Sequence, residues 1–231
     1  MNAQDEKKMQ RRQILKLGAG GALALTLPAC ATLPGFSFTD AVRRLLLLSS
    51  ENAFARLTAD GGYWDNQVGQ LGLDRLLGIS GGSVGSFLTS TLFKSRLDGA
   101  FADVAIKGSE AAAPIVVEAV RNAGITGASA ILRGGPTAAR DFLQGQLGGG
   151  LVQVMVPELG QAIRIANEPL VGQLISSLTG VDAGGIASRM AGSVNDSIWR
   201  EIGVEEQAIR ADPQSTGDPL LIGTLAVGSA L

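Results

Sequence analysis

The chain has 231 residues, of which 45% are apolar, enough to bury a hydrophobic core, and its formal net charge is −2. Histidine is absent, which excludes catalytic triads and metal sites that depend on an imidazole. The single cysteine excludes an internal disulfide and a cysteine zinc cluster. The slight excess of acidic residues gives no basic surface for nucleic acid, so we expect no nucleic-acid partner.

Residues 1–29 have the layout of an export signal. A polar, basic start precedes residues 17–29, which carry no charge and are fewer than the ~20 residues that a transmembrane helix needs. The basic part resembles the twin-arginine pattern, in which two arginines precede any residue, a large apolar residue, Leu and Lys. The matching residues are Arg11, Arg12, Leu15 and Lys16. An ordinary Sec signal with a chance arginine pair is the alternative interpretation.

The only cysteine follows this signal directly. Residues 27–30, Leu-Pro-Ala-Cys, resemble a bacterial lipobox, in which processing makes the cysteine the acylated first residue of the mature protein. Two or three acyl chains on Cys30 would anchor the protein stably, whereas one chain binds a membrane only marginally. Conventional cleavage after Ala29 or Ala31 is the alternative. The lipobox interpretation predicts a lipid-anchored, periplasm-facing protein of the bacterial envelope, with the outer membrane slightly preferred because Ala31 is not the Asp that favours the inner one.

Residues 30–38 are predicted to form an acylated tether and residues 39–231 a helical domain. Thr39 is in position to cap a helix over 40–57, which has an acidic residue in its first turn. The leucine run 45–48 is apolar all round, so we expect this helix to lie in the middle of a bundle.

A glycine turn at 59–62 comes next, followed by a weak helical pattern over 63–77. The glycine and serine cluster 78–86 is the expected hinge. Apolar residues at near-helical spacing then predict a helix over 87–108.

Prolines and glycines are expected to divide the following segment into separate helices. Pro114 is in position to begin a helix that Gly124 ends. Thr126 is in position to cap a short helix that runs through Arg133, and the glycines at 134–135 end it.

Pro136 is expected to open another helix, which the three glycines at 148–150 break. Its polar side holds Arg140, Asp141 and Gln144. Pro157 and Pro169 are predicted to divide the next residues into short helical pieces, and 180–185 to form a loop.

The last long helix is predicted over 186–211, with Glu206 and Arg210 able to pair across one turn. Its apolar residues recur at steps of four: Met190, Val194, Ile198 and Ile202. The Asp-Pro pair at 212–213 ends it. Because no segment alternates at a period of two, the sequence predicts an all-α fold, an irregular multi-helix bundle.

The order of four motifs resembles a bacterial family of exported helical proteins, domain-of-unknown-function family 4197. The stretches that carry this resemblance are Glu110-Ala-Ala-Ala-Pro114, Ala130-Ile-Leu-Arg-Gly-Gly135, Thr137-Ala-Ala-Arg-Asp-Phe142 and Glu205-Glu-Gln-Ala-Ile-Arg210, followed by Asp212-Pro213 and Leu220-Leu221. The resemblance implies an α-helical fold and a location in the envelope. It implies no catalytic residues.

One motif suggests a serine hydrolase. Residues 78–82, Gly-Ile-Ser-Gly-Gly, match the G-x-S-x-G pattern, which needs a strand before the serine. Residues 71–77 show no strand pattern, and without histidine only a Ser-Asp dyad remains. The Asp-Gly pairs at Asp60 and Asp98 lie upstream of Ser80 or only shortly downstream of it. We therefore expect a flexible loop and no catalytic residue. The same glycines lack the lysine of a P-loop, so no cofactor is expected.

A group of acidic residues suggests a cation site. Glu201, Glu205 and Glu206 place carboxylates on adjacent turns of one helix, a spacing that could serve a hard cation such as calcium. Arg200 and Arg210 are close enough in sequence to pair with them. We therefore expect a solvated helix face and no metal site.

Two function hypotheses remain. The first is a non-enzymatic lipoprotein that contacts the membrane through lipid on Cys30 and whose helical body binds another envelope component, such as a protein. The second is a carrier that holds a lipid or another apolar molecule between its helices. Tyr63, Trp64 and Trp199 could line such a pocket, although a role as core anchors explains them more simply. A serine hydrolase at Ser80 comes third.

Overall fold

The computed structural model describes residues 37–77, 91–165 and 183–228. All regular secondary structure in these three ranges is helical, which confirms the predicted all-α fold. Within the same ranges, no helix has both the length and the apolar character needed to cross a bilayer. Several predictions lie outside the described residues: the lipidation site Cys30, the serine Ser80, Pro169, and the export residues Arg11, Arg12, Leu15 and Lys16.

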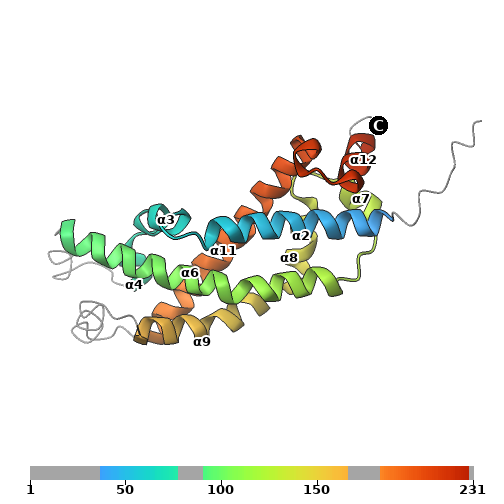
Figure 1. Ribbon diagram of the computed structural model, residues 1–231. Coiled ribbons are helices and arrows are strands. Elements are labelled where there is room, and N and C mark those ends of the chain that lie inside the picture. Colours follow the sequence, from blue (N-terminus) through green and yellow to red (C-terminus); the bar gives the residue numbers. More distant parts are fainter. Residues whose placement is uncertain (1–36, 78–90, 166–182, 229–231) are drawn as a thin grey trace, which may run out of the picture. The chain divides into compact units, whose positions relative to one another are not determined.

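Four long helices form the frame of the body: α2 (Phe38–Leu57), α6 (Thr91–Asn122), α9 (Gly150–Ile165) and α11 (Ala183–Ala211). Helix α11 packs against α9 and α2, and α6 packs against the same two helices, so that the four close a ring. Successive long helices run in opposite directions, and α11 crosses the others obliquely (Figure 1). Apolar stripes of all four meet in one continuous core.

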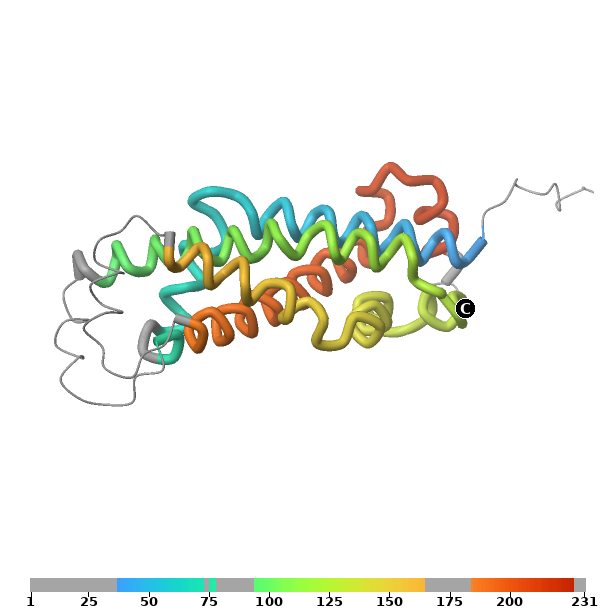
Figure 2. Tube along the Cα trace, turned by 90° about the horizontal axis from the view of Figure 1, so that it is seen from below, coloured from blue at the N-terminus to red at the C-terminus, as the bar shows by residue number. Residues whose placement is uncertain are grey.

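Shorter elements cover the ends and edges of this frame. They are α3 (Tyr63–Leu71), α4 (Leu73–Leu77), α7 (Ala128–Leu132), α8 (Ala138–Leu147), the 3-10 turn η1 (Pro213–Thr216) and α12 (Pro219–Gly228). Helix α3 packs on α6, and α8 packs on α11. Both α7 and α12 pack on α2. In Figure 2, α7 and α8 follow one another toward the end of the body that lies away from the short α3 and α4.

The core contains both tryptophans, as expected for anchors. Trp64 and Trp199 expose 1% and 2% of their surface. The Trp64 Nε1 donates to Ser109 Oγ at 3.1 Å, so its one polar group is satisfied inside the core. The predicted four-residue spacing on α11 is also confirmed, because its members are all buried: Met190, Val194, Ile198 and Ile202.

Two predicted helix caps are wrong. Helix α2 begins at Phe38 and is capped by Ser37, whose Oγ accepts from the Asp40 amide at 3.1 Å. The Ser37 hydroxyl also donates to the Asp40 carboxylate at 2.7 Å, and this hydrogen bond lowers the pKa of Asp40. Ser37 and Asp40, three residues apart, thus form hydrogen bonds with each other at the start of the helix. Thr39 lies inside the first turn and is not the cap. Thr126 caps nothing: the residue before α7 is Gly127, in the left-handed conformation with φ +67°.

Two predicted helix breaks at proline are also wrong. Pro114 lies inside α6 and Pro157 inside α9, and both are exposed. A proline inside a helix costs about 3 kcal/mol because one backbone hydrogen bond is lost. The burial of apolar side chains before and after each proline in its helix offsets this cost. The buried neighbours are Ala112, Val116, Met155 and Leu159.

Two further boundaries and the burial of one apolar run differ from expectation. The weak helix over 63–77 is two helices, separated at Gly72, whose φ of +78° only glycine adopts freely. Helix α11 already begins at Ala183, inside the expected loop at 180–185. The leucine run of α2 is not buried all round: Leu45 and Leu46 are fully buried, whereas the two leucines that follow are half-buried.

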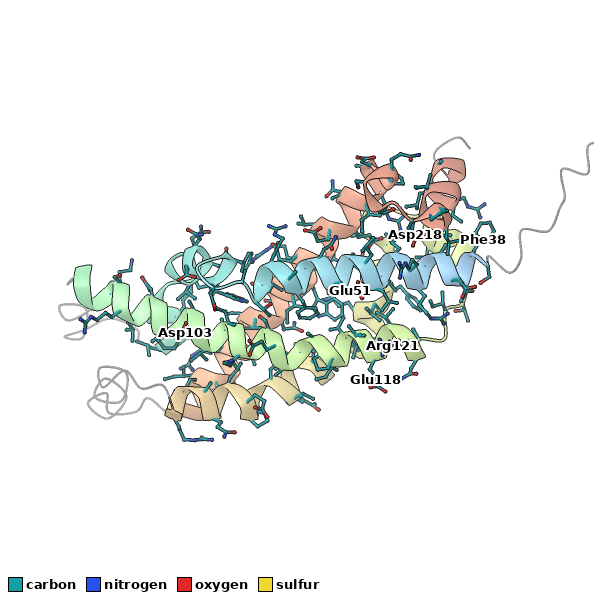
Figure 3. The ribbon with its side chains drawn as sticks, in the orientation of Figure 1. Phe38, Glu51, Asp103, Glu118, Arg121 and Asp218 are labelled. Atoms are coloured by element: carbon teal, nitrogen blue, oxygen red, sulfur yellow. The ribbon has the colours of Figure 1, made fainter. Side chains whose placement is uncertain are left out.

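Helix α12 is attached to the start of α2 through Asp218. Its Oδ1 accepts from the Leu220 amide at 2.9 Å, which caps α12. Its Oδ2 lies 2.6 Å from the Arg44 Nε, and Figure 3 shows Asp218 near Phe38 at the first turn of α2. Burial opposes ionisation of this carboxyl, but the hydrogen bonds from Arg44 and from the α12 amides lower its pKa.

Candidate functional site

A groove of about 340 Å³ opens to solvent between α8 and α11. We call it the α8–α11 groove. Its lining consists of Thr137, Arg140, Gln144, Asp196, Trp199, Arg200, Gly203, Val204 and Gln207. The volume is at the lower end of the range for ligand-binding clefts.

Helical spacing explains why these residues share one groove. On α11 the lining residues recur at steps of three and four, which places them on one face. Gly203 lets α8 approach this face, because a Cβ there would lie 3.2 Å from Thr137 Cγ2 and 3.4 Å from Arg140 Nε. A larger residue at 203 would push these two side chains away.

A buried carboxylate fixes the start of α8 beside the groove. Glu206 on α11 is fully buried. Its Oε1 accepts from the Ala139 amide at 3.0 Å, and its Oε2 accepts from the Arg140 amide at 2.7 Å. These are amides of the first turn of α8, which have no partner inside their own helix. The negative charge of Glu206 also suits the positive end of the helix dipole.

An arginine completes this arrangement on the other side. The Arg210 Nε donates to Glu206 Oε1 at 2.8 Å, which confirms the pair predicted from the sequence. Its other nitrogens donate to the carbonyl oxygens of Leu132 at 2.8 Å and Ile131 at 3.1 Å, at the end of α7. One ion pair therefore forms hydrogen bonds with the backbone carbonyl oxygens at the end of α7 and with the backbone amides at the start of α8. We call it the Glu206–Arg210 clamp.

The clamp corrects the expectation of a solvated acidic face. Glu206 faces α8, whereas Glu201 and Glu205 face α2, where Arg56 lies 3.1 Å and 2.9 Å from their carboxylates. The hydrogen bond with Glu205 is the main cause of a raised pKa at Arg56. Glu201 is buried as well. In the part of the chain that the structure describes, no cluster of three or more acidic or cysteine residues could hold a metal ion.

Two arginines in the groove offer guanidinium groups to a ligand. The Arg140 Nε lies 3.0 Å from Asp141 Oδ1 but makes no hydrogen bond of good geometry with a described residue. Arg200 donates to Ser197 Oγ at 3.2 Å and to the Tyr63 hydroxyl, and its guanidinium carbon lies 5.9 Å from the Tyr63 ring centre. The Arg200 Nε also lies 3.8 Å from Glu201 Oε1, which confirms the predicted pairing of Arg200 with the acidic group. These contacts hold Arg200 while leaving half of its side chain exposed.

The turn between α7 and α8 is closely packed, and a matched pair of variants tests this. Gly134→Ala should lower the free energy of unfolding by about 1–3 kcal/mol, as overpacking does. The added Cβ would lie 2.6 Å from Ala138 Cβ and 3.2 Å from the Ala130 carbonyl oxygen. Gly135→Ala is the control: nothing lies within 4 Å of its Cβ position, and we expect a change within about 0.5 kcal/mol. Urea denaturation followed by circular dichroism measures both, and equal losses would contradict close packing at Gly134.

Three of the four stretches that carry the family resemblance meet at this clamp: the end of α7, the start of α8 and residues 205–210 of α11. A family model described as a protein of unknown function, DUF4197, matches residues 32–224. The chain belongs to this family. No curated protein and no solved structure matches it.

The sequence indicated parts of this site but not the groove. The helical pattern predicts Arg140 and Gln144 on a polar helix face, Arg200 beside the acidic group, and Trp199 in the core. The missed lining residues are Thr137, Asp196, Gly203, Val204 and Gln207. The available signal is Gly203 on a helix face that also carries Asp196, Arg200 and Gln207 at steps of three and four, since a glycine inside a long helix often marks a close approach.

Proposed function

We propose that the protein is a lipid-anchored binding protein of the bacterial envelope, without catalytic machinery, whose helical body holds another envelope protein in the α8–α11 groove. The observation that carries this proposal is the groove itself. It combines two partly exposed arginines with an exposed apolar side chain, Val204, on a frame that the Glu206–Arg210 clamp keeps in place. A preformed frame of this kind lowers the cost of ordering the site when a partner binds.

The lining of the groove favours a protein partner over the alternative, an acyl chain. Arg140, Arg200 and Gln144 present charged and amide groups. An acyl chain laid over them would remove water from these groups without replacing their hydrogen bonds, which costs free energy. A protein surface can supply carboxylates and peptide groups in return.

The lipid on Cys30 would keep the helical body near the membrane. Ser37, the first described residue, lies seven positions after Cys30. An extended chain of that length spans about 25 Å at most. The partner would therefore be one that stands in or near the same membrane.

A photocrosslinking experiment in cells tests the proposal. A benzophenone amino acid replaces Val204 in the full chain, and Val154 on α9 is the matched control, because the two valines expose 43% and 45% of their surface. We expect a discrete protein adduct at position 204 that is absent at 154. The adduct should fall at least about tenfold when Arg140→Gln and Arg200→Gln are combined, because both guanidinium groups are lost.

Three other results would contradict it. A lipid adduct at 204 would favour the carrier. Equal adducts at 204 and 154 would indicate non-specific contact, and the absence of any protein adduct at 204 would remove the groove as the binding site.

A further inference from the structure

We infer that the α8–α11 groove recognises a peptide segment that carries a carboxylate beside a small apolar side chain. This inference rests on the proposed function and deepens it, because it names the chemistry by which the groove holds its partner.

The charge of the groove selects an anion. Arg140 from α8 and Arg200 from α11 line it, and Asp196 is the one carboxylate in the lining that the structure describes. Arg200 also faces Glu201 outside the lining, where its Nε lies 3.8 Å from Glu201 Oε1. A guanidinium presents parallel N–H groups that match the two oxygens of a carboxylate. Asp141, which pairs with Arg140, is 59% exposed and is not part of the lining, so an incoming carboxylate can replace it without leaving it buried and unpaired.

Side chains, rather than the amides at the start of α8, must bind this anion. Glu206 already accepts from the Ala139 and Arg140 amides at 3.0 Å and 2.7 Å. The same bond fixes the backbone of Arg140, and the Arg140 side chain runs along Gly203 at close range. Its guanidinium is therefore oriented before a ligand arrives, which makes Glu206 a positioning residue for the groove.

The rest of the lining indicates a peptide rather than a bare anion such as phosphate. Val204 exposes 43% of its surface within the groove, where it can contact a small apolar side chain. Gln144 and Gln207 carry amide groups that both donate and accept hydrogen bonds, as the backbone of an extended peptide requires. A phosphate ion would use the arginines and leave these three residues without a role.

The two tryptophans provide a direct measurement of binding. Trp199 is among the residues that line the groove, and its indole donates to Asn195 Oδ1 at 3.0 Å, whereas the Trp64 indole donates to Ser109 Oγ within the core. The mature acylated chain, with ¹⁵N-labelled tryptophan and held in lipid nanodiscs, should give one indole NMR signal for each. The variant Trp199→Phe assigns them, and the Trp64 signal is the internal control.

Four probes separate the sources of the anion. They are the peptide acetyl-Ala-Ala-Val with a free C-terminal carboxylate, the same peptide as an amide, acetyl-Ala-Glu-Val amide, and inorganic phosphate. We expect a saturable shift of the Trp199 signal with at least one of the two carboxylate peptides, and no shift of the Trp64 signal. A response to the first identifies a chain terminus as the source, and a response to the third identifies an acidic side chain.

Arginine variants connect this shift to the groove. Arg140→Gln should weaken binding of the active peptide at least about tenfold, because one charged hydrogen-bond donor is lost. Arg200→Gln should do the same. Arg121→Gln, at an exposed position on α6 that Figure 3 labels, is the control and should change the affinity less than twofold.

The outcomes distinguish this inference from the proposed function. The inference is overturned if the amide peptide or phosphate shifts the Trp199 signal as much as a carboxylate peptide does. It is also overturned if neither carboxylate peptide shifts that signal. The crosslink at Val204 tests the envelope partner separately. A peptide-induced shift without a crosslink at Val204 keeps the ligand class and rejects the envelope partner.

Discussion

Glu206→Ala should lower the free energy of unfolding by about 3–5 kcal/mol, the usual cost of removing one member of a buried ion pair. The variant leaves Arg210 beside a cavity, with only 12% of its side chain exposed and no carboxylate opposite it. It also leaves the Ala139 and Arg140 amides without the acceptor that they have at 3.0 Å and 2.7 Å. Both losses occur where water is largely excluded, so neither is compensated by hydration.

A surface pair of similar geometry provides the control. Glu110 lies 2.7 Å from Lys107 in a bridge between residues three apart on α6, and both side chains are well exposed. Glu110→Ala should cost less than about 1 kcal/mol, because solvent screens the pair. Urea denaturation of the two variants measures the difference. Similar losses would show that Glu206 does not act as a buried clamp.

A double-mutant cycle separates the ion pair from the helix caps. Arg210→Ala removes the donor to Glu206 and to the Leu132 and Ile131 carbonyl oxygens. Because the two residues share one network, the loss in the double variant should be smaller than the sum of the two single losses. The loss of stability in the double variant, less the coupling between the two side chains, measures what the backbone amides and carbonyl oxygens gain from the clamp.

The clamp illustrates how far sequence patterns predicted this structure. The spacing of Glu206 and Arg210 predicted their pairing, because residues four apart on a helix are neighbours whatever surrounds the helix. Burial of the pair depends on α7 and α8, whose bonded residues lie 66 to 79 positions earlier in the chain than their partners. Intrahelical spacing carries no information on that contact, and a solvated face was therefore expected.

The same limit explains the errors at proline. Pro114 and Pro157 are strong local signals against a helix interior. Helices α6 and α9 nevertheless continue through them, because each presents buried residues on both sides of its proline to the same core. Local signals do determine the start of α2 and the break at Gly72, although the sequence analysis assigns the cap to Thr39 rather than Ser37 and continues the helix through Gly72.

The groove was hidden for a further reason. Its two sides come from segments that are distant in sequence, and its depth depends on the missing side chain of Gly203. Helical spacing predicts that Arg140 lies on a polar face but does not identify what packs against that face. Only the packing of α8 on α11 brings Arg140 and Arg200 to one surface.

Cys30→Ala should release the protein from the membrane, as either a soluble periplasmic protein or an unprocessed precursor. The two or three acyl chains that Cys30 would carry would bury many methylene groups, each contributing about 0.8 kcal/mol, and the substitution would remove them all. The chain after Ala29 has more acidic than basic residues, so an anionic lipid surface offers it no electrostatic attraction in return. Fractionation of cells, with immunodetection of the full chain, measures this release.

Ala31→Ser is the matched control for this substitution, because it changes the neighbouring residue and keeps the thiol that would carry the lipid. We expect it to fractionate with the membrane as the unaltered chain does. Mature Cys30→Ala protein that still sediments with membranes would contradict the lipid anchor. If such protein also kept the crosslink at Val204, the partner in the groove would itself hold the chain at the membrane, and the site of attachment would be Arg140 and Arg200 rather than Cys30.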